Sequence, residues 1–298
     1  SYIARAKERF DIIQISFIDP WAATAAGAYV LSENSLYTVE AWTLFLTRLN
    51  PHGVLTVSRW YFPDRPAEMY RVASLAAASL KQLGVENPRN HIAIVRHLFE
   101  RGEGTQGMGS ILVARDPFTE EDLARLDEAA AKLQFDVILS PRFSSDSTFA
   151  ALASGYDLDQ FVASYPLNIA APTDDAPFFF QMLRLGGIFK RELRQEGGQS
   201  LNLLAVSVLG ILLIVVCGLT FLCIIIPLIL TTDNTALPGA LPLFTFFACI
   251  GLGFMLIEVS QMQRLIIFLG HPTYSLSVVL FSLLLSSGLG SFSIGRIC

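Results

Sequence analysis

The sequence predicts the C-terminal half of a doubly wound α/β domain, followed by an α-helical transmembrane region. Two observations lead to this fold class: charge is confined to the first part of the chain, and strands alternate with helices there. All but two of the 21 Lys and Arg, and all but two of the 26 Asp and Glu, stand in residues 1–200. Such a break in composition separates a water-soluble part from a lipid-soluble part. We therefore expect a domain at 1–186, a basic juxtamembrane linker at 187–200 and a membrane region at 201–298.

Apolar runs and amphipathic stretches alternate within the first domain. Residues 11–18, "DIIQISFI", are typical of a parallel strand buried on both faces. The elements that follow are a helix at 35–49, the turn "NPHG" at 50–53, a strand at 54–60, a helix at 66–83, strands at 91–99 and 109–116, a helix at 120–133 and a strand at 136–141. Thr119 is the expected cap of the last helix, with Asp122 where a capping box prefers Glu or Gln. This order matches the second half of a doubly wound sheet.

The composition also excludes several function classes. No G-x-G-x-x-G precedes a helix in residues 1–200, so we expect the nucleotide-binding half of the fold upstream of Ser1. The net charge is −5 and no basic stripe is present, which argues against nucleic acid as a partner. The four cysteines all lie beyond residue 200 without C-x-x-C spacing, so we expect packing cysteines and no bound metal.

Three apolar stretches are long enough to span a bilayer, which takes about 20 residues of helix. They run from about 201 to 230, 241 to 259 and 272 to 294. The alternative, a globular core helix, fits poorly with the thirty uncharged residues of the first stretch. Lys190, Arg191 and Arg194 precede that stretch, which predicts a multi-pass protein of the inner (plasma) membrane with its domain in the cytoplasm.

The predicted spans carry small residues and one acid. The small residues, which would let helices approach closely in lipid, are Gly251, Gly253, Ser286, Ser287, Gly288, Gly290 and Ser291. The expected partners are therefore the lipid bilayer and other membrane subunits that dock on these faces. Glu258 is either a functional intramembrane carboxylate or an interfacial ion pair or cap near Arg264.

The stretch from Phe10 to Trp60 resembles the polyamine aminopropyltransferases, the spermidine and spermine synthases. In that family a strand reads roughly Y-D-V-I-x-x-D-S-S-D-P, a loop ending in E-S-L-Y/F follows, and L-x-P-x-G-x-L comes after the next helix. The matching positions are Phe10, Asp11, Ile12 and Ile13 at the strand start, Asp19 and Pro20 at its end, Ser35, Leu36 and Tyr37 at the helix start, and Pro51 and Gly53 at the turn.

A closer resemblance is to bacterial membrane proteins that join such a domain to several transmembrane helices. Their pattern includes T-D-D-x-P-F-F-F, found here at 173–180, and G-F-M-L-I-E-x-S-Q-M-Q-R, found at 253–264. The resemblance covers nearly the whole chain. It implies a Rossmann-like fold of the class I methyltransferase and spermidine synthase type more firmly than it implies an activity.

The resemblance also implies roles for particular residues. Ser16 stands where the synthases have the Asp that acts as general base, and a missing base costs about 10²–10⁴-fold in rate. Asp19 matches the acid that helps to hold the cationic amine substrate, and Glu33 and Tyr37 flank the same mouth. If the protein is active, the cofactor would be decarboxylated S-adenosylmethionine or S-adenosylmethionine, bound mostly upstream of Ser1.

These binding residues have structural alternatives. Asp19 before Pro20 could be a turn residue, and Glu33 could favour the N-terminus of the next helix. Asp174 and Asp175 could bind a cation or an amine, or could simply form the turn into "FFFQMLRL" at 178–185, which would then lie on the membrane surface.

Three functions follow from these alternatives. The first is a membrane-anchored aminopropyl- or other S-adenosylmethionine-dependent transferase with an altered active site. The second is a non-catalytic scaffold or accessory subunit of a membrane complex. The third is small-molecule transport, which three helices and one carboxylate support poorly.

Overall fold

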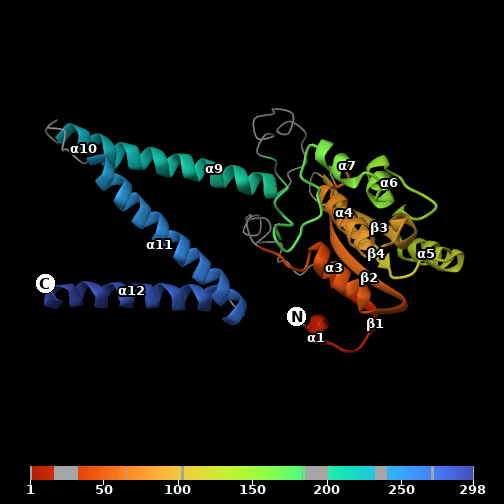
Figure 1. The fold of residues 1–298 in the computed structure, drawn as a ribbon. Helices are drawn as coiled ribbons and strands as arrows, with labels where there is room; N and C mark the ends of the chain where they lie inside the picture. Colours follow the sequence, from red (N-terminus) through yellow and green to blue (C-terminus); the bar gives the residue numbers. More distant parts are fainter. Residues whose placement is uncertain are drawn as a thin grey trace. The chain divides into compact units, whose positions relative to one another are not determined.

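The computed structural model describes residues 2–16, 33–64, 66–101, 104–182, 184, 201–231, 240–269 and 272–297. The chain divides into two compact units, Ser1–Gly218 and Leu219–Cys298, and helix α9 (Leu201–Thr220) runs across the division. The first unit holds a sheet with its helices, and the second holds apolar helices (Figure 1).

The first unit is built on a mixed sheet of five strands in the order β1-β2-β4-β3-β5. The strands are β1 (Phe10–Ser16), β2 (Leu49–Tyr61), β3 (Ile92–Arg101), β4 (Gly104–Ala114) and β5 (Asp136–Leu139). β1 and β2 are parallel and are connected through α3 (Val39–Thr47), whereas the other three pairs are antiparallel. The α/β domain that the sequence predicts is therefore confirmed, together with the order of its main elements.

Helices pack against this sheet in the positions that the apolar spacing predicts. α3 contacts β2, and α4 (Ala67–Gln82) contacts both β2 and β4. The other helical segments of this unit are α1 (Tyr2–Arg5), η1 (Pro88–His91), α5 (Glu120–Leu133), α6 (Ser147–Ser154) and α7 (Leu158–Ser164), of which only α5 is predicted from the sequence. Twelve of the 16 residues of α4 are buried, because its many alanines let the helix lie close to the sheet and to its neighbours.

The two faces of the sheet differ in burial. Leu55, Val57 and Arg59 alternate along β2 on the buried face, which carries the hydrophobic core, while the residues between them are half-buried. On β1, Ile13 and Ile15 are buried but Ile12 is 67% exposed. The prediction that this strand is buried on both faces is wrong, because β1 is an edge strand and only one of its faces packs on the core.

Two local predictions have different outcomes. The capping box of α5 forms, with the Thr119 side chain accepting from the Asp122 N–H and the Asp122 carboxylate accepting from the Thr119 N–H and hydroxyl. These hydrogen bonds lower the pKa of Asp122. The turn expected at 50–53 lies instead inside β2, where a shift of register against Phe10 and Ile12 accommodates it. His52 there has φ 61°, the left-handed conformation that a bulge can require.

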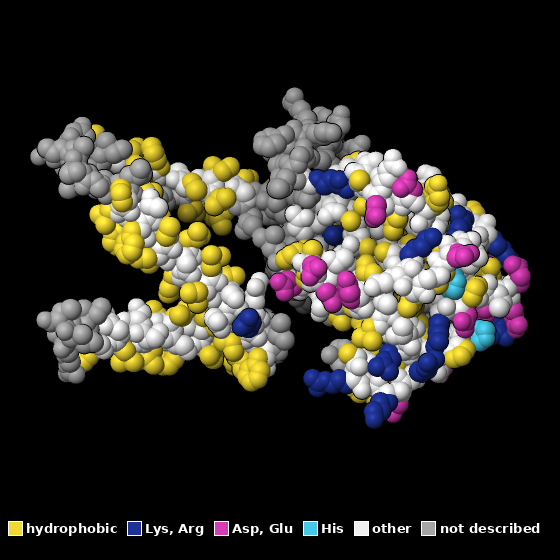
Figure 2. Space-filling model, in the orientation of Figure 1, with side chains coloured by type: hydrophobic (Ala, Val, Ile, Leu, Met, Phe, Trp, Pro, Cys, Tyr) yellow, Lys and Arg dark blue, Asp and Glu magenta, His cyan; other side chains and the backbone are white. Residues whose placement is uncertain are grey.

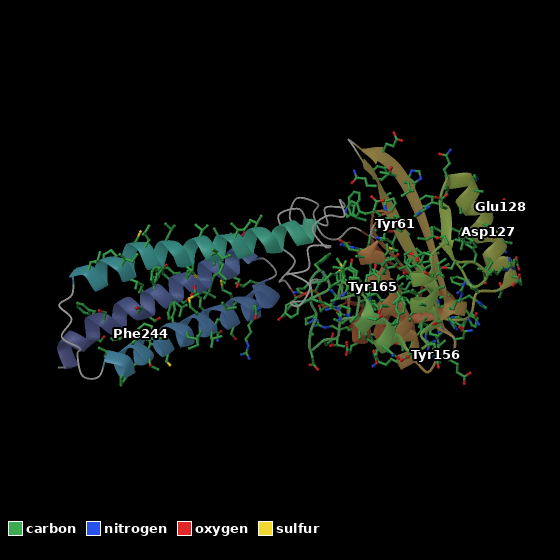
Figure 3. All side chains as sticks on the ribbon, turned by 90° about the horizontal axis from the view of Figure 1, so that it is seen from above. Tyr61, Asp127, Glu128, Tyr156, Tyr165 and Phe244 are labelled. Atoms are coloured by element: carbon green, nitrogen blue, oxygen red, sulfur yellow. The ribbon has the colours of Figure 1, made fainter. Side chains whose placement is uncertain are left out.

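The chain from Leu201 onward forms apolar helices with hydrophobic surfaces, and the part after Gly218 makes up the second unit. α9 continues through a π-helical turn, η3 (Phe221–Ile225), into α10 (Ile226–Thr231), and α11 (Ala240–Leu269) and α12 (Pro272–Ile297) follow. Figure 2 shows most of the visible charged side chains on the domain that contains the sheet, whereas the visible faces of the apolar helices are hydrophobic or uncharged apart from a basic side chain. Phe244 on α11 is 71% exposed (Figure 3).

Two of the three predicted spans meet the length and apolarity that a bilayer requires. They are Pro242–Leu265 in α11 and Thr273–Ser293 in α12. The first predicted span is helical, but its apolar segment among the described residues is the shorter Gly210–Cys223. The protein thus has an α/β domain and two helices able to cross a membrane.

Candidate functional site

The carboxyl end of β1 carries Ser16, the residue that the resemblance aligns with a general base. Its side chain is exposed, and its hydroxyl has no hydrogen-bond partner in the part of the chain that the structure describes. Ser16 pairs with Ser58 of β2, and Ser58 pairs with Ser110 of β4, so the three hydroxyls lie in a row on one face of the sheet. The oxygens of Ser58 and Ser110 are 2.8 Å apart. This row can hydrogen-bond a polar ligand, but it contains no acid or base that would accept a proton from an amine.

Of the other two acids predicted near this strand end, the structure describes only one. Asp19 lies outside the described residues. Glu33 is exposed and makes no hydrogen bond or ion pair within the described chain. The next residue, Asn34, donates its N–H to the carbonyl of Pro177 at 2.7 Å, which places the segment after Glu33 beside the T-D-D-x-P-F-F-F segment.

Tyr37 is fully buried, in an aromatic cluster. Its ring stacks on Phe179 with centroids 4.5 Å apart and meets the edge of Phe180 at 6.4 Å. Its hydroxyl accepts a hydrogen bond from Nη1 of Arg59 at 3.3 Å. The phenol is therefore held between a core cation and two rings.

Arg59 connects this cluster to α4. Its guanidinium is 1% exposed and donates from Nε and Nη2 to Oε2 of Glu68, at 3.1 and 3.0 Å. It also lies over the ring of Phe180, 4.9 Å from the centroid. A buried guanidinium that has both a carboxylate and aromatic faces around it is well compensated, so its charge fixes this arrangement of side chains.

Asp174 is tied to the start of α3 through Thr38. The buried Thr38 hydroxyl donates to Oδ1 of Asp174 at 2.6 Å and accepts from the N–H of Ala41, as an N-cap does. The N–H of Asp174 donates to Oε2 of Glu40 at 3.0 Å. Asp175 is exposed and has no hydrogen bond or ion pair among the described residues. The two acids are therefore not equivalent: one joins two segments and the other faces solvent.

Arg71 holds the segment that follows these acids. From α4 it donates to the carbonyls of Ala170, Phe179 and Gln181, at 2.9, 2.6 and 2.8 Å. Burial lowers the pKa of Arg71 to about 10. The expectation that "FFFQMLRL" lies on the membrane surface is wrong for its aromatic part, because Phe179 and Phe180 are fully buried against the sheet domain.

The structure brings Tyr37 and Asp174 to one side of the candidate site. Their partners, Arg59 for Tyr37 and Thr38 for Asp174, are not predicted from the sequence. Two signals could have identified the missed arginines. Arg59 follows Leu55 and Val57 at the spacing of two that marks the buried face of β2. Arg71 lies four residues before Leu75, within the buried face of α4.

The described residues contain no group of three His, Cys, Asp or Glu that could hold a metal ion. Cys217, Cys223 and Cys249 are free and lie exposed on the apolar helices.

No protein-family model matches the chain, and no curated protein matches it.

Proposed function

We propose that the chain is a membrane-anchored, spermidine synthase-like protein whose sheet domain has lost aminopropyl transfer and serves as a non-catalytic scaffold or accessory module. The observation that carries the proposal is that two of the candidate binding residues have their side chains engaged within the fold. Tyr37 is enclosed in the core and Asp174 is bound to Thr38, so both stabilise the fold. The strand end keeps an exposed serine where base catalysis would need a carboxylate.

A Rossmann-like arrangement is supported by the first part of the sheet. A parallel pair joined through α3, followed by α4 and an antiparallel strand beside β2, fits half of a doubly wound sheet. Parallel strands are usually covered on both faces, so the exposed Ile12 on the edge strand supports a further layer or strand packed beside β1. The nucleotide-binding half expected upstream of Ser1 would supply that layer.

The proposed placement is in the inner membrane, with more than one helix crossing and the sheet domain in the cytoplasm. The two apolar helices support the crossing, and the basic residues before α9 support the orientation. An Ala129→Cys variant tests the orientation, because that exposed position lies on α5 in the sheet domain. A membrane-impermeant maleimide should label it in inside-out vesicles and not in intact cells; labelling in intact cells would reverse the orientation.

The test of function is binding and turnover by the complete protein in lipid nanodiscs. Calorimetry with S-adenosylmethionine, its decarboxylated form and methylthioadenosine measures whether the nucleoside site persists. We expect no methylthioadenosine to form from the decarboxylated cofactor and a polyamine, whether or not the nucleosides bind. Formation above the rate of empty nanodiscs would restore the transferase hypothesis.

A matched variant distinguishes a protein that lacks only the general base from one that has also lost the binding site for the substrates. Ser16→Asp replaces the serine with the carboxylate that the synthases carry. Turnover by this variant alone would mean that only the base is absent and that substrates still bind. Absence of turnover in both proteins is the result expected for a scaffold, and absence of nucleoside binding as well would show that the nucleoside site is also lost.

A further inference from the structure

Arg264 is a basic residue on a mainly apolar helix. It lies on α11, next to the last residue of the candidate span Pro242–Leu265, and its side chain is exposed. Its guanidinium makes no hydrogen bond or ion pair with the residues that the structure describes. Because a guanidinium keeps its charge throughout the physiological pH range, this position requires an anion or water as its partner.

The length of α11 places Arg264 at the depth of the lipid headgroups. From Pro242 to Gln261 the helix rises about 28 Å, and the hydrocarbon core of a bilayer has a thickness of about 30 Å. Arg264 lies three residues further along, which is about 4.5 Å past the end of that core. A helix that crosses the bilayer in this way has the guanidinium beside the lipid phosphates.

Helix α12 supports the same depth. The fully buried hydroxyl of Ser275 donates a hydrogen bond of 2.8 Å to the carbonyl of Met262 on α11. This contact sets the start of the second candidate span, Thr273–Ser293, level with the end of the span in α11. Tyr274 at this level is 65% exposed, and tyrosine is enriched where a membrane meets water. Both helices therefore have their polar boundary at the same place.

The side of α11 that carries Arg264 changes from apolar to polar at this boundary. The exposed apolar residues that recur on this side at helical spacing are Ile250 (52%), Phe254 (49%) and Ile257 (58%). Gln261 and Arg264 follow on the same side and are exposed as well. The contact with α12 uses the opposite side, that of Met262, so this side of α11 is open to lipid.

We propose that Arg264 and Gln261 bind the phosphate of an anionic phospholipid whose acyl chains lie along the apolar residues of the same side of α11. The guanidinium donates N–H groups to the phosphate oxygens, and the Gln261 amide supplies a further donor. The nearest acid along the helix, Glu258, is half-buried on the side of Met262 and makes no ion pair with Arg264. A headgroup with net negative charge therefore binds better than a zwitterionic one, whose own amine competes for the phosphate.

The proposal rests on the membrane placement proposed above and is independent of whether the sheet domain binds a nucleoside. It is tested on the full chain in nanodiscs that contain equal amounts of phosphatidylglycerol and phosphatidylcholine. Native mass spectrometry of the released chain measures the ratio of the two lipids that stay bound. A chain that does not enter nanodiscs contradicts the membrane placement, whereas a chain that enters them without a lipid preference contradicts only this proposal.

We expect the wild-type chain to retain phosphatidylglycerol in preference to phosphatidylcholine. Arg264→Gln should lower the ratio about fivefold, the effect of one basic side chain at an anionic lipid surface, whereas Arg264→Lys keeps the charge and should keep the preference. Arg125→Gln is the control, because it removes an exposed charge from α5 in the sheet domain and should leave the ratio unchanged. Equal retention of both lipids by the wild type, or an unchanged ratio in Arg264→Gln, overturns the proposal. Displacement of the lipid by excess inorganic phosphate would show a site for a free anion and also overturns it.

Discussion

The two sides of the candidate site differ in what their polar side chains contact. On the side of the aromatic cluster, called the buried side, Tyr37 accepts from Arg59, and Asp174, which is itself exposed, accepts from the buried Thr38 hydroxyl. The second group, called the strand-end side after Ser16, consists of exposed candidates: Ser16, Glu33 and Asp175 make no hydrogen bond or ion pair with the described side chains. Residue types that look alike in a motif thus have two physical roles here, one in the fold and one available to a ligand.

The difference teaches that contact with a buried partner, rather than residue type, separates fold-stabilising from ligand-accessible positions. A buried polar group must have partners within the protein, since water cannot reach it. Substitutions on the buried side should therefore lower the free energy of unfolding, whereas substitutions on the strand-end side should leave it nearly unchanged. Each prediction below measures this quantity by urea unfolding of the full chain in detergent, followed by near-UV circular dichroism of the sheet domain.

The largest effect is expected for Phe179→Ala on the buried side. Phe179 is fully buried, stacks on Tyr37 and contributes a carbonyl to Arg71. Removal of a buried phenyl ring costs about 3–5 kcal/mol through lost burial and the cavity left behind. The control is Phe143→Ala, because Phe143 is 51% exposed and should change stability by less than about 0.5 kcal/mol. A similar loss in both variants would mean that the aromatic cluster does not stabilise this domain.

The next effect is expected for Arg59→Met. The variant leaves the Glu68 carboxylate, whose side chain is only 13% exposed, without its guanidinium partner. Removal of one member of a buried pair costs about 3–5 kcal/mol, and the lower end applies because Glu68 keeps some contact with water. Adding Glu68→Gln should recover part of the loss, because the orphaned charge disappears. If the losses of the two single variants simply add in the double variant, Arg59 does not stabilise the domain through its ion pair with Glu68.

A smaller effect separates the two adjacent acids. Asp174→Ala removes the acceptor of the Thr38 hydroxyl, and a hydrogen bond of this kind is worth about 1 kcal/mol. Asp175→Ala is the matched control, one residue away in the same turn, and should stay within about 0.5 kcal/mol of the wild type. Equal effects would show that the acidic turn acts as a unit and would remove the distinction between the two sides.

The sequence was sufficient for the strands and for helices α3, α4 and α5, but not for the short helices such as α6 and α7 and not for this distinction. Alternation along β2 and helical spacing along α4 are local patterns, so both elements follow from them. The burial of Tyr37 depends instead on Phe179, and Thr38 meets an acid 136 residues later in the chain. Contacts across such separations leave no local pattern, which is why Tyr37 was predicted at an open mouth.

The edge strand shows the same limit for a different reason. "DIIQISFI" has the composition of a strand covered on both faces, and its core-facing residues, Ile13 and Ile15, are buried as predicted. The exposure of Ile12 depends on what packs beside β1, which the composition of the strand does not encode. Asp19, the acid that the resemblance ranks highest, lies outside the described residues, so its role stays a prediction.

The smallest effect is expected on the strand-end side, where Ser16→Ala and Glu33→Gln should each change stability by less than about 0.5 kcal/mol. Both side chains are exposed and neither has a hydrogen-bond partner among the described residues, so no packing or pairing is lost. Because folding is unaffected, any change in nucleoside binding by these variants in calorimetry reports a direct contact with the ligand. A loss of stability as large as that of Asp174→Ala would instead place these residues in the fold, and the strand end would then have no side chain reserved for a ligand.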